Sequence, residues 1–171
     1  MMAISLGLGA AIAVALIAVV SVLTGGSTAP SNPLDGTHLG ELGLPNAQGA
    51  TPRSPWKEGH PTVIVFFASW CSPCKAELPK VAHWVTTHPL GDVRVLGIDS
   101  NDAEAAGLVF SQDAHVTFPV VFDEGGTVTS GVFRLGALPD TVFVDADGVV
   151  NSVIEGPVTD AELAQGVAAI S

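Results

Sequence analysis

The stretch 62-TVIVFFASWCSPCKAELP-79 decides the fold of this chain. Residues 62–67 are an unbroken run of β-branched and aromatic side chains, which is typical of a strand buried on both faces and therefore central in a sheet. Residues 74–88 carry apolar side chains at mostly helical spacing, so a helix is predicted directly after this strand. Pro79 should kink this helix rather than end it, because the apolar pattern continues beyond the proline.

Strands and helices alternate along the rest of the sequence. A turn from Asp145 to Gly148 predicts a hairpin, and Thr159 or Asp160 is suited to cap the last helix. The order predicts an α/β three-layer sandwich with a mixed central sheet. The expected strands are residues 93–98, 120–122, 141–144 and 149–154, and the expected helices are residues 102–114, about 127–135, and 160–170.

The N-terminal segment has the composition of a membrane span. Residues 3–24 are almost entirely apolar and would extend about 33 Å as a helix, enough to cross a bilayer. We therefore expect a transmembrane helix within residues 1–25, a flexible linker over residues 26–45 and one domain over residues 46–171. A cleaved signal peptide is the alternative, since Ser27-Thr28-Ala29 offers a small-residue cleavage site. No basic residue precedes Arg53, so charge does not fix the orientation of the span.

The charged residues all lie beyond position 34, so the net charge of −11 belongs to the C-terminal part. Such a surface repels phosphate groups, which argues against nucleic-acid binding and against adhesion to anionic lipid. The Gly-, Ser-, Pro- and Asn-rich stretch that suggests the tether ends at about Gly36. From there to His60, scattered Pro and Gly residues with Leu39, Leu42, Leu44 and Trp56 predict short strands or loops packed on the domain edge.

Cys71 and Cys74 are the two cysteines of the chain, which leaves no disulfide framework and no four-thiolate zinc site. They lie after the buried strand and at the start of a helix, where free N–H groups and the helix macrodipole favour a thiolate. Cys71 is therefore the expected nucleophile, and Cys74, one turn further along, the expected resolving thiol. A disulfide closing so small a loop adds little stability, which favours a redox role over a structural one.

The segment 65-VFFASWCSPCKAELP-79 resembles the active site of thioredoxins. Within that superfamily it is most similar to the membrane-tethered TlpA/ResA-like group, on account of Glu77, Pro79 and the later Leu138-Pro139. The resemblance covers about residues 56–169. It implies an extracytoplasmic thiol-disulfide oxidoreductase of the protein-disulfide reductase type, which uses its redox-active disulfide and neither a further cofactor nor a metal.

The resemblance also implies roles for residues around the cysteines. Pro139 is expected to have a cis peptide bond and to form, with Trp70, the groove that receives a substrate backbone. Glu77 is expected to move protons for the cysteine pair, because the buried Asp of thioredoxins matches Val65 here; a solvated surface glutamate is the alternative. Asp140 departs from the family, which usually has Thr after the cis-proline. A carboxylate there would either disfavour the Cys71 thiolate or select a basic substrate.

Ser72 and Pro73, between the cysteines, influence the direction of electron flow. They supply no positive charge and no His, which favours a reductant over a disulfide-donating oxidase for secreted proteins. The resemblance implies client proteins with disulfides, apocytochrome c first among them as in cytochrome c biogenesis, and a membrane electron-transfer protein as recycling partner. Two functions of a different kind stay open: a Cu(I) chaperone that recruits His60 or His115, and a non-catalytic interaction domain.

Overall fold

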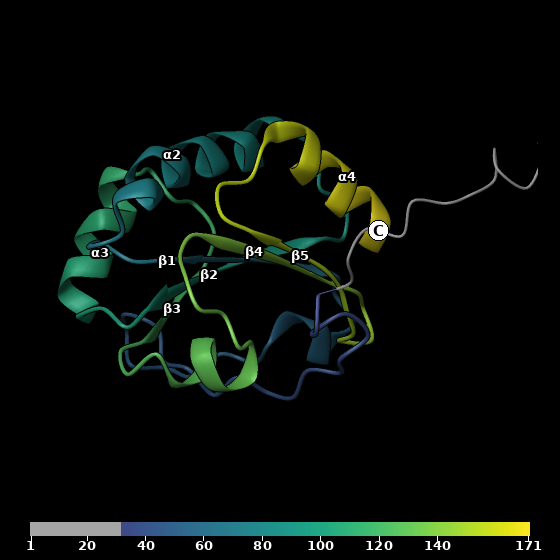
Figure 1. The fold of residues 1–171 in the computed structure, drawn as a ribbon, viewed down its shortest axis with the longest axis horizontal. Helices are drawn as coiled ribbons and strands as arrows, with labels where there is room; N and C mark the ends of the chain where they lie inside the picture. The colour runs from purple at the N-terminus through teal and green to yellow at the C-terminus, as the bar shows by residue number, and fades with distance from the viewer. Residues whose placement is uncertain (1–31) are drawn as a thin grey trace, which may run out of the picture. The chain divides into compact units, whose positions relative to one another are not determined.

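A computed structural model describes residues 32–171 of the chain, which fold around one five-stranded sheet (Figure 1). Strand β1 lies at the centre and all its side chains are buried, which confirms the prediction for residues 62–67. Strands β1, β2 and β3 are parallel, β4 is antiparallel to β1, and β5 is antiparallel to β4. The sheet order is β3-β2-β1-β4-β5. The strands are β1 (Thr62–Phe67), β2 (Arg94–Ser100), β3 (Val120–Asp123), β4 (Asp140–Val144) and β5 (Val150–Glu155).

Helices cover both faces of this sheet (Figure 1). On one face lie α2 (Ser72–Thr87), α3 (Glu104–Asp113) and α4 (Asp160–Ile170). On the other lie the 3-10 helix η1 (Pro55–Glu58) and the π-helical turn η2 (Val128–Val132). Each face has its own apolar core: Phe67 and Leu78 belong to the first core, and Phe66 and Phe133 to the second. The predicted three-layer sandwich with a mixed sheet is therefore confirmed.

The local signals in the sequence determine several helix ends. Helix α2 begins directly after Cys71 and continues through Pro79, as the apolar pattern predicted. Helix α4 is capped by Thr159, whose hydroxyl accepts the Glu162 N–H at 3.3 Å, while the Glu162 carboxylate accepts the Thr159 N–H at 2.8 Å. This reciprocal pair satisfies two N–H groups that a helix N-terminus otherwise leaves free.

Residues 32–45 belong to the folded domain, although the sequence led us to expect a flexible linker over residues 26–45. Leu34 and Leu39 are buried in the second apolar core, together with Phe66 and Phe133. The Gly36 N–H donates to the Val150 carbonyl at 2.8 Å, so this segment is tied to β5 by backbone bonds as well as by apolar contacts. Leu39 had been expected to pack on the domain edge, whereas Leu34 was hidden by the Pro, Asn and Gly residues around it.

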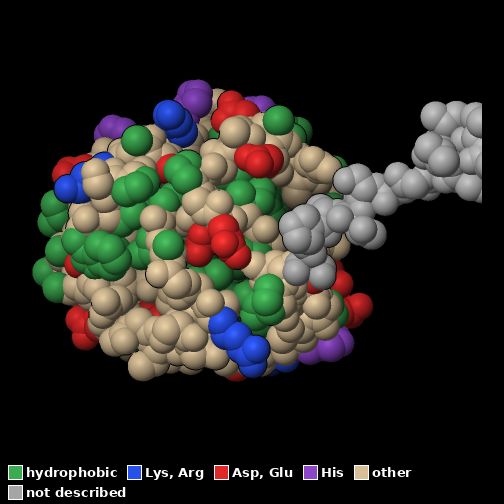
Figure 2. Space-filling model, viewed as in Figure 1, with side chains coloured by type: hydrophobic (Ala, Val, Ile, Leu, Met, Phe, Trp, Pro, Cys, Tyr) green, Lys and Arg blue, Asp and Glu red, His purple; other side chains and the backbone are tan. Residues whose placement is uncertain are grey.

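The transmembrane helix predicted within residues 1–25 lies outside the described residues, as do linker residues 26–31. Among the helices of residues 32–171, none combines the length and the apolar character needed to span a membrane. On the surface, Figure 2 shows acidic side chains both near the middle of one face and along its edges, and fewer Lys and Arg side chains toward the edges.

Candidate active site

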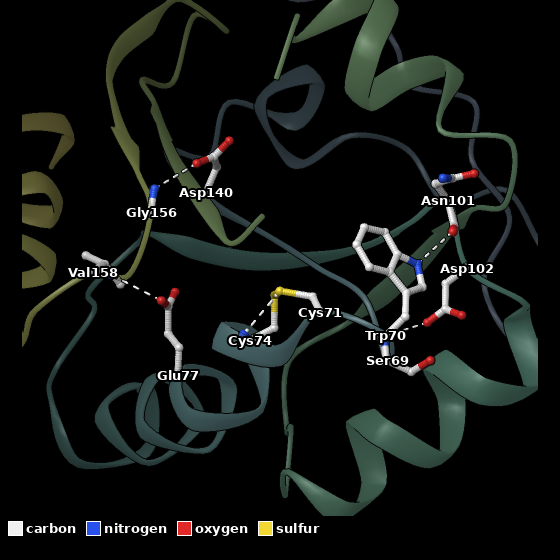
Figure 3. The surroundings of a disulfide bond; sticks show 10 residues. All are labelled: Ser69, Trp70, Cys71, Cys74, Glu77, Asn101, Asp102, Asp140, Gly156 and Val158. Atoms are coloured by element: carbon white, nitrogen blue, oxygen red, sulfur yellow. Dashed lines mark hydrogen bonds between the residues drawn. A yellow bond between two sulfur atoms is a disulfide. The ribbon is translucent and has the colours of Figure 1, made fainter. Parts of the chain in front are cut away.

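Cys71 and Cys74 form a disulfide at the N-terminus of α2, with their Cα atoms 5.3 Å apart (Figure 3). Cys71 is the N-cap residue of this helix, and its Sγ accepts the Cys74 N–H at 3.2 Å. An N–H group and the positive end of a helix dipole both stabilise negative charge on the sulfur that they face. The geometry therefore favours a thiolate on Cys71 after the disulfide has been reduced.

Exposure does not distinguish the two cysteines in the disulfide form. Cys71 is 3% exposed and Cys74 is 1% exposed, so both are buried. Their difference lies in hydrogen bonding, because only the Cys71 sulfur receives an N–H group within residues 32–171. Trp70, which is 56% exposed, marks the accessible edge next to the pair, and its indole N–H donates to the Asn101 carbonyl at 2.9 Å.

Glu77 lies on α2, one turn beyond Cys74, and is 5% exposed. Its Oε2 accepts the Val158 N–H at 3.2 Å, whereas Oε1 has no hydrogen-bond partner within residues 32–171. Burial raises the pKa of Glu77 to about 7 against the opposing Val158 hydrogen bond, and the charge of Asp140 contributes to the increase. The alternative of a solvated surface glutamate is wrong, and this carboxyl group can exchange a proton near neutral pH.

Asp140 supplies a second buried carboxyl group on the same side of the disulfide (Figure 3). It follows Pro139, whose peptide bond with Leu138 is cis, as the resemblance implied. Asp140 is 2% exposed, and its Oδ1 accepts the Gly156 N–H at 2.9 Å. Burial raises the pKa of Asp140 to about 6 in spite of this hydrogen bond. Two acids with elevated pKa values thus lie beside the cysteine pair.

A cavity of about 230 Å³ lies beside Trp70, where the sequence predicted a substrate groove. The chain that leads into the cis-proline contributes its residues 135–138, whereas Pro139 does not line the cavity. No charged side chain of residues 32–171 lines it. The other residues of the lining come from the glycine-containing segment around η2 and from the end of β2; they are Ser100, Asn101, Gly125, Gly126, Thr129 and Ser130.

The sequence also singled out Ser72 and Pro73 between the cysteines, and His60 and His115 as candidate metal ligands. Ser72 and Pro73 are exposed in the first turn of α2 and bring no charge to the cysteines. No group of three or more His, Cys, Asp or Glu side chains in residues 32–171 is placed to hold a metal ion. His60 and His115 therefore do not join the cysteines in a copper site of that kind.

Asp99 was missed by the sequence analysis. It lies near the end of β2 and is 1% exposed, and neither of its oxygens has a hydrogen-bond partner in the described part of the chain. Burial raises the pKa of Asp99 to about 8, and the neighbouring Asp102 contributes to the increase. The expected strand ended at residue 98, which placed Asp99 in a loop. An acid directly after the largely apolar run of residues 95–98 was the signal that could have identified it.

Sequence comparison relates the chain to redox proteins. Residues 36–153 match the family model described as AhpC/TSA family. The chain is 28% identical over 102 residues to thiol-disulfide oxidoreductase ResA of Oceanobacillus iheyensis, a match covering 60% of this chain and 53% of the relative. It is 29% identical over 106 residues to the ResA protein of Bacillus cereus, covering 62% and 61%. The chain thus spans less than two thirds of the length of these relatives.

Structural comparison agrees with the sequence matches. The structure of MTB dsbF in its mixed oxidized and reduced forms superposes with a TM-score of 0.66 at 29% sequence identity. The match covers 75% of this chain and 93% of the other. The fold is therefore the thioredoxin-like α/β fold that the sequence predicted.

Proposed function

Because the chain belongs to the AhpC/TSA family, we propose that it is a thiol-disulfide oxidoreductase of the ResA type that acts through Cys71 and Cys74. One observation carries the proposal: the two cysteines form a disulfide at a helix N-terminus, where the Cys71 sulfur accepts the Cys74 N–H. This arrangement supports a two-electron couple in which both electrons are held by the sulfur pair. The similarity to the ResA proteins supports the same chemistry.

In the reducing direction, the Cys71 thiolate attacks one sulfur of a client disulfide. A Cys71–client disulfide forms, and the other client sulfur leaves as a thiolate. Cys74 then loses its proton and attacks the Cys71 sulfur, which forms the Cys71–Cys74 disulfide and releases the second client thiolate. The client gains two electrons, and the cysteine pair loses them.

Glu77 is proposed to accept the proton of Cys74. Its side chain lies one turn along the same helix, beside the disulfide in Figure 3, and its Oε1 has no partner within residues 32–171. A base is most effective when its pKa lies near the working pH, and the pKa of Glu77 is raised by burial to about 7. Asp140 lies close enough to influence that value.

We propose reduction rather than oxidation as the physiological direction, with disulfides of proteins such as apocytochrome c as substrates. Ser72 and Pro73 add no positive charge that would favour the reduced form of the pair. A membrane electron-transfer protein would then return electrons to the disulfide. The redox potential of the full chain tests the direction: about −270 mV would support a reductant, whereas about −120 mV would indicate a disulfide-donating oxidase.

The domain is further proposed to act outside the cytoplasm, held at the cell membrane by its N-terminal segment. The apolar run over residues 3–24 supports this location. Extraction of isolated membranes at alkaline pH tests the anchor, because a spanning helix stays in the membrane and a cleaved secreted domain does not. Protease added to intact cells or spheroplasts tests the side, since only an extracytoplasmic domain is digested.

Trapping of the client tests the reaction itself. The variant Cys74→Ala cannot resolve a mixed disulfide, so it should accumulate covalent complexes through Cys71 that a reductant releases. The matched control is Cys71→Ala, which keeps one cysteine but loses the proposed nucleophile. Complexes in the first variant and their absence in the control support the proposal. Equal amounts in both variants, or none in either, would contradict it.

A further inference from the structure

A second cavity, of about 460 Å³, adjoins Asp140, and the proposed redox mechanism does not use it. Its volume is within the range of about 300–1,000 Å³ that is typical of ligand pockets. Asp140 pairs with Phe66 at the end of β1 that leads to Cys71. Figure 3 shows Asp140 and Trp70 on either side of the disulfide, and residues 135–137 line both this cavity and the one beside Trp70. The second cavity therefore lies next to the place where a client would be attacked.

Two acids of adjacent strands line this cavity. Asp140 of β4 and Glu155 of β5 are directly opposite each other in the antiparallel pairing, so their side chains project from the same face of the sheet. Glu155 is exposed, and its Oε1 accepts the Asn32 side-chain amide at 3.0 Å. Like charges at directly opposite positions destabilise a sheet. A cation bound beside both carboxylates would offset this repulsion.

The carboxylate of Asp140 has only part of its hydrogen bonds. The residue is 2% exposed, and its Oδ1 accepts the Gly156 N–H at 2.9 Å. Its Oδ2 accepts no hydrogen bond from residues 32–171. Burial of a carboxylate costs free energy unless its oxygens receive hydrogen bonds or an opposite charge. A positively charged donor in the cavity would supply both at once.

The rest of the lining suits a long side chain with a charged end. Leu34, Phe133 and Leu135 are buried residues of the second apolar core, and they form an apolar wall of the cavity. Lysine and arginine side chains pack their methylene groups on such a surface while the charged end stays with polar partners.

Arg134 also lines the cavity, but its side chain is exposed. Burial raises the pKa of Asp140 to about 6 and the charge of Glu155 adds to the increase, whereas the charge of Arg134 has no comparable effect. The two acids therefore remain available to a cation that comes from another molecule.

We propose that this cavity binds a lysine or arginine side chain of the client, whose positive group contacts Asp140 and Glu155 and whose methylene groups pack on the apolar wall. The inference rests on the proposed function and names a class of substrate for it. The preferred clients carry a basic residue close to the disulfide that Cys71 attacks. Asp140 then binds the substrate, in addition to its effect on Glu77.

Two peptides of equal composition separate this contact from the general attraction that a net charge of −11 exerts on basic peptides. Each has one cysteine, joined by a disulfide to an aromatic thiol, and one lysine. Cys71 of the reduced full chain attacks the peptide sulfur, and absorbance follows the aromatic thiolate that leaves. In a near-lysine series the lysine lies one to four residues from the cysteine; in the far-lysine isomer it lies at the other end.

The near-lysine peptide should react faster at pH 7.5, where Asp140 is ionised. At the best position, its second-order rate constant should exceed that of the far-lysine isomer about three- to tenfold, as expected for one partly buried charged contact. A ratio near one at every lysine position would overturn the proposal and leave the oxidoreductase intact.

Variants test which residues carry the preference. Asp140→Asn should bring the ratio close to one, because the amide loses the charge, and Glu155→Gln should reduce it in part. Glu58→Gln, at an exposed acid of η1, should retain it. Each ratio compares two peptides on the same variant, so an effect of the substitution on the cysteines cancels. A ratio that Asp140→Asn leaves unchanged would overturn the proposal.

Binding to the oxidised full chain tests the cavity without turnover. Failure of the unmodified chain to react with any peptide would count against the oxidoreductase alone, and binding would then decide on the cavity. The probes are the near-lysine and far-lysine peptides with serine in place of cysteine. In nuclear magnetic resonance spectra, the near-lysine peptide should shift the Gly156 amide resonance more than its isomer does, because this amide donates to Asp140. Asp140→Asn should remove the difference, and equal shifts in the unmodified chain would overturn the proposal.

Discussion

Glu77 shows how one side chain can set the pH at which the cysteine pair works. Below about pH 7 it holds its own proton and cannot take one from Cys74, so the resolving step should accelerate as pH rises through 7. Glu77→Gln should slow this step by at least about tenfold and remove its dependence on pH near 7. Single-turnover release of a client peptide from its mixed disulfide with Cys71 measures the step.

An exposed glutamate provides the control for this prediction. Glu58→Gln removes one negative charge from the surface and should leave the rate and its pH profile unchanged. If the rate of the resolving step in Glu77→Gln still increased with pH near 7, another group would have to accept the proton.

The charge of Asp140 should help to set the pKa of Glu77. It is buried after the cis-proline, and its charge contributes to the raised pKa of Glu77. Replacement by the residue usual in the family, Asp140→Thr, should therefore lower the pKa of Glu77 and move the resolving step to lower pH. The same single-turnover profile measures the shift. Glu58→Gln, at an exposed acid of η1, should leave it in place. A profile unchanged by Asp140→Thr would show that the two carboxyl groups act independently.

The sequence predicted the roles of some residues better than those of others. Cys71 and Cys74 could be assigned because their spacing and their place between a strand and a helix are local properties. The role of Glu77 was inferred from family resemblance; its burial was not predicted, because it involves a contact with Val158, 81 positions away. Asp99 was missed for a similar reason: its burial against Gly107 of α3 is a tertiary property.

At the scale of elements, Gly166 shows packing overriding helix propensity. It lies within α4, where Ala would ordinarily be the better helix former by about 1 kcal/mol. A Cβ at position 166, however, would overlap the ring of Phe143, which is fully buried in β4 and cannot move aside. Gly166→Ala should therefore lower the free energy of unfolding by about 1–3 kcal/mol, measured by urea denaturation. Gln165→Ala, on the exposed side of α4, should have little effect, and a stabilised Gly166→Ala would contradict this packing.

The regular elements were predicted well where local patterns are strong. Strand β1 was placed at its observed residues, and the final hairpin and α4 were placed to within about one residue. Residues 32–45 were misjudged, because their regular backbone contacts are few and their anchors are isolated leucines. The partner of such a segment lies far along the chain, at β5, and no periodicity within the segment reveals it.

At the scale of the whole domain, three buried acids make stability depend on pH. Burial raises the pKa of Asp99 from 3.8 to about 8, that of Glu77 from 4.5 to about 7 and that of Asp140 from 3.8 to about 6. At a pH between the pKa of the unfolded chain and the raised pKa of the folded domain, each acid is protonated in the folded domain and ionised in the unfolded chain. The folded state therefore binds more protons, and its stability falls as pH rises through these ranges.

The free energy of unfolding of the oxidised chain should consequently be higher at pH 5 than at pH 8, as measured by urea denaturation. Each acid contributes a slope of about 1.4 kcal/mol per pH unit within its range. Glu77 completes most of its titration by pH 8, so Asp99 supplies most of the slope between pH 7 and 8. Asp99→Asn should therefore reduce that slope strongly and leave a decline between pH 4.5 and 6. Asp113→Asn should keep the full slope, since this acid is exposed. Stability that rises from pH 5 to pH 8 would mean that the buried acids are ionised in the folded domain.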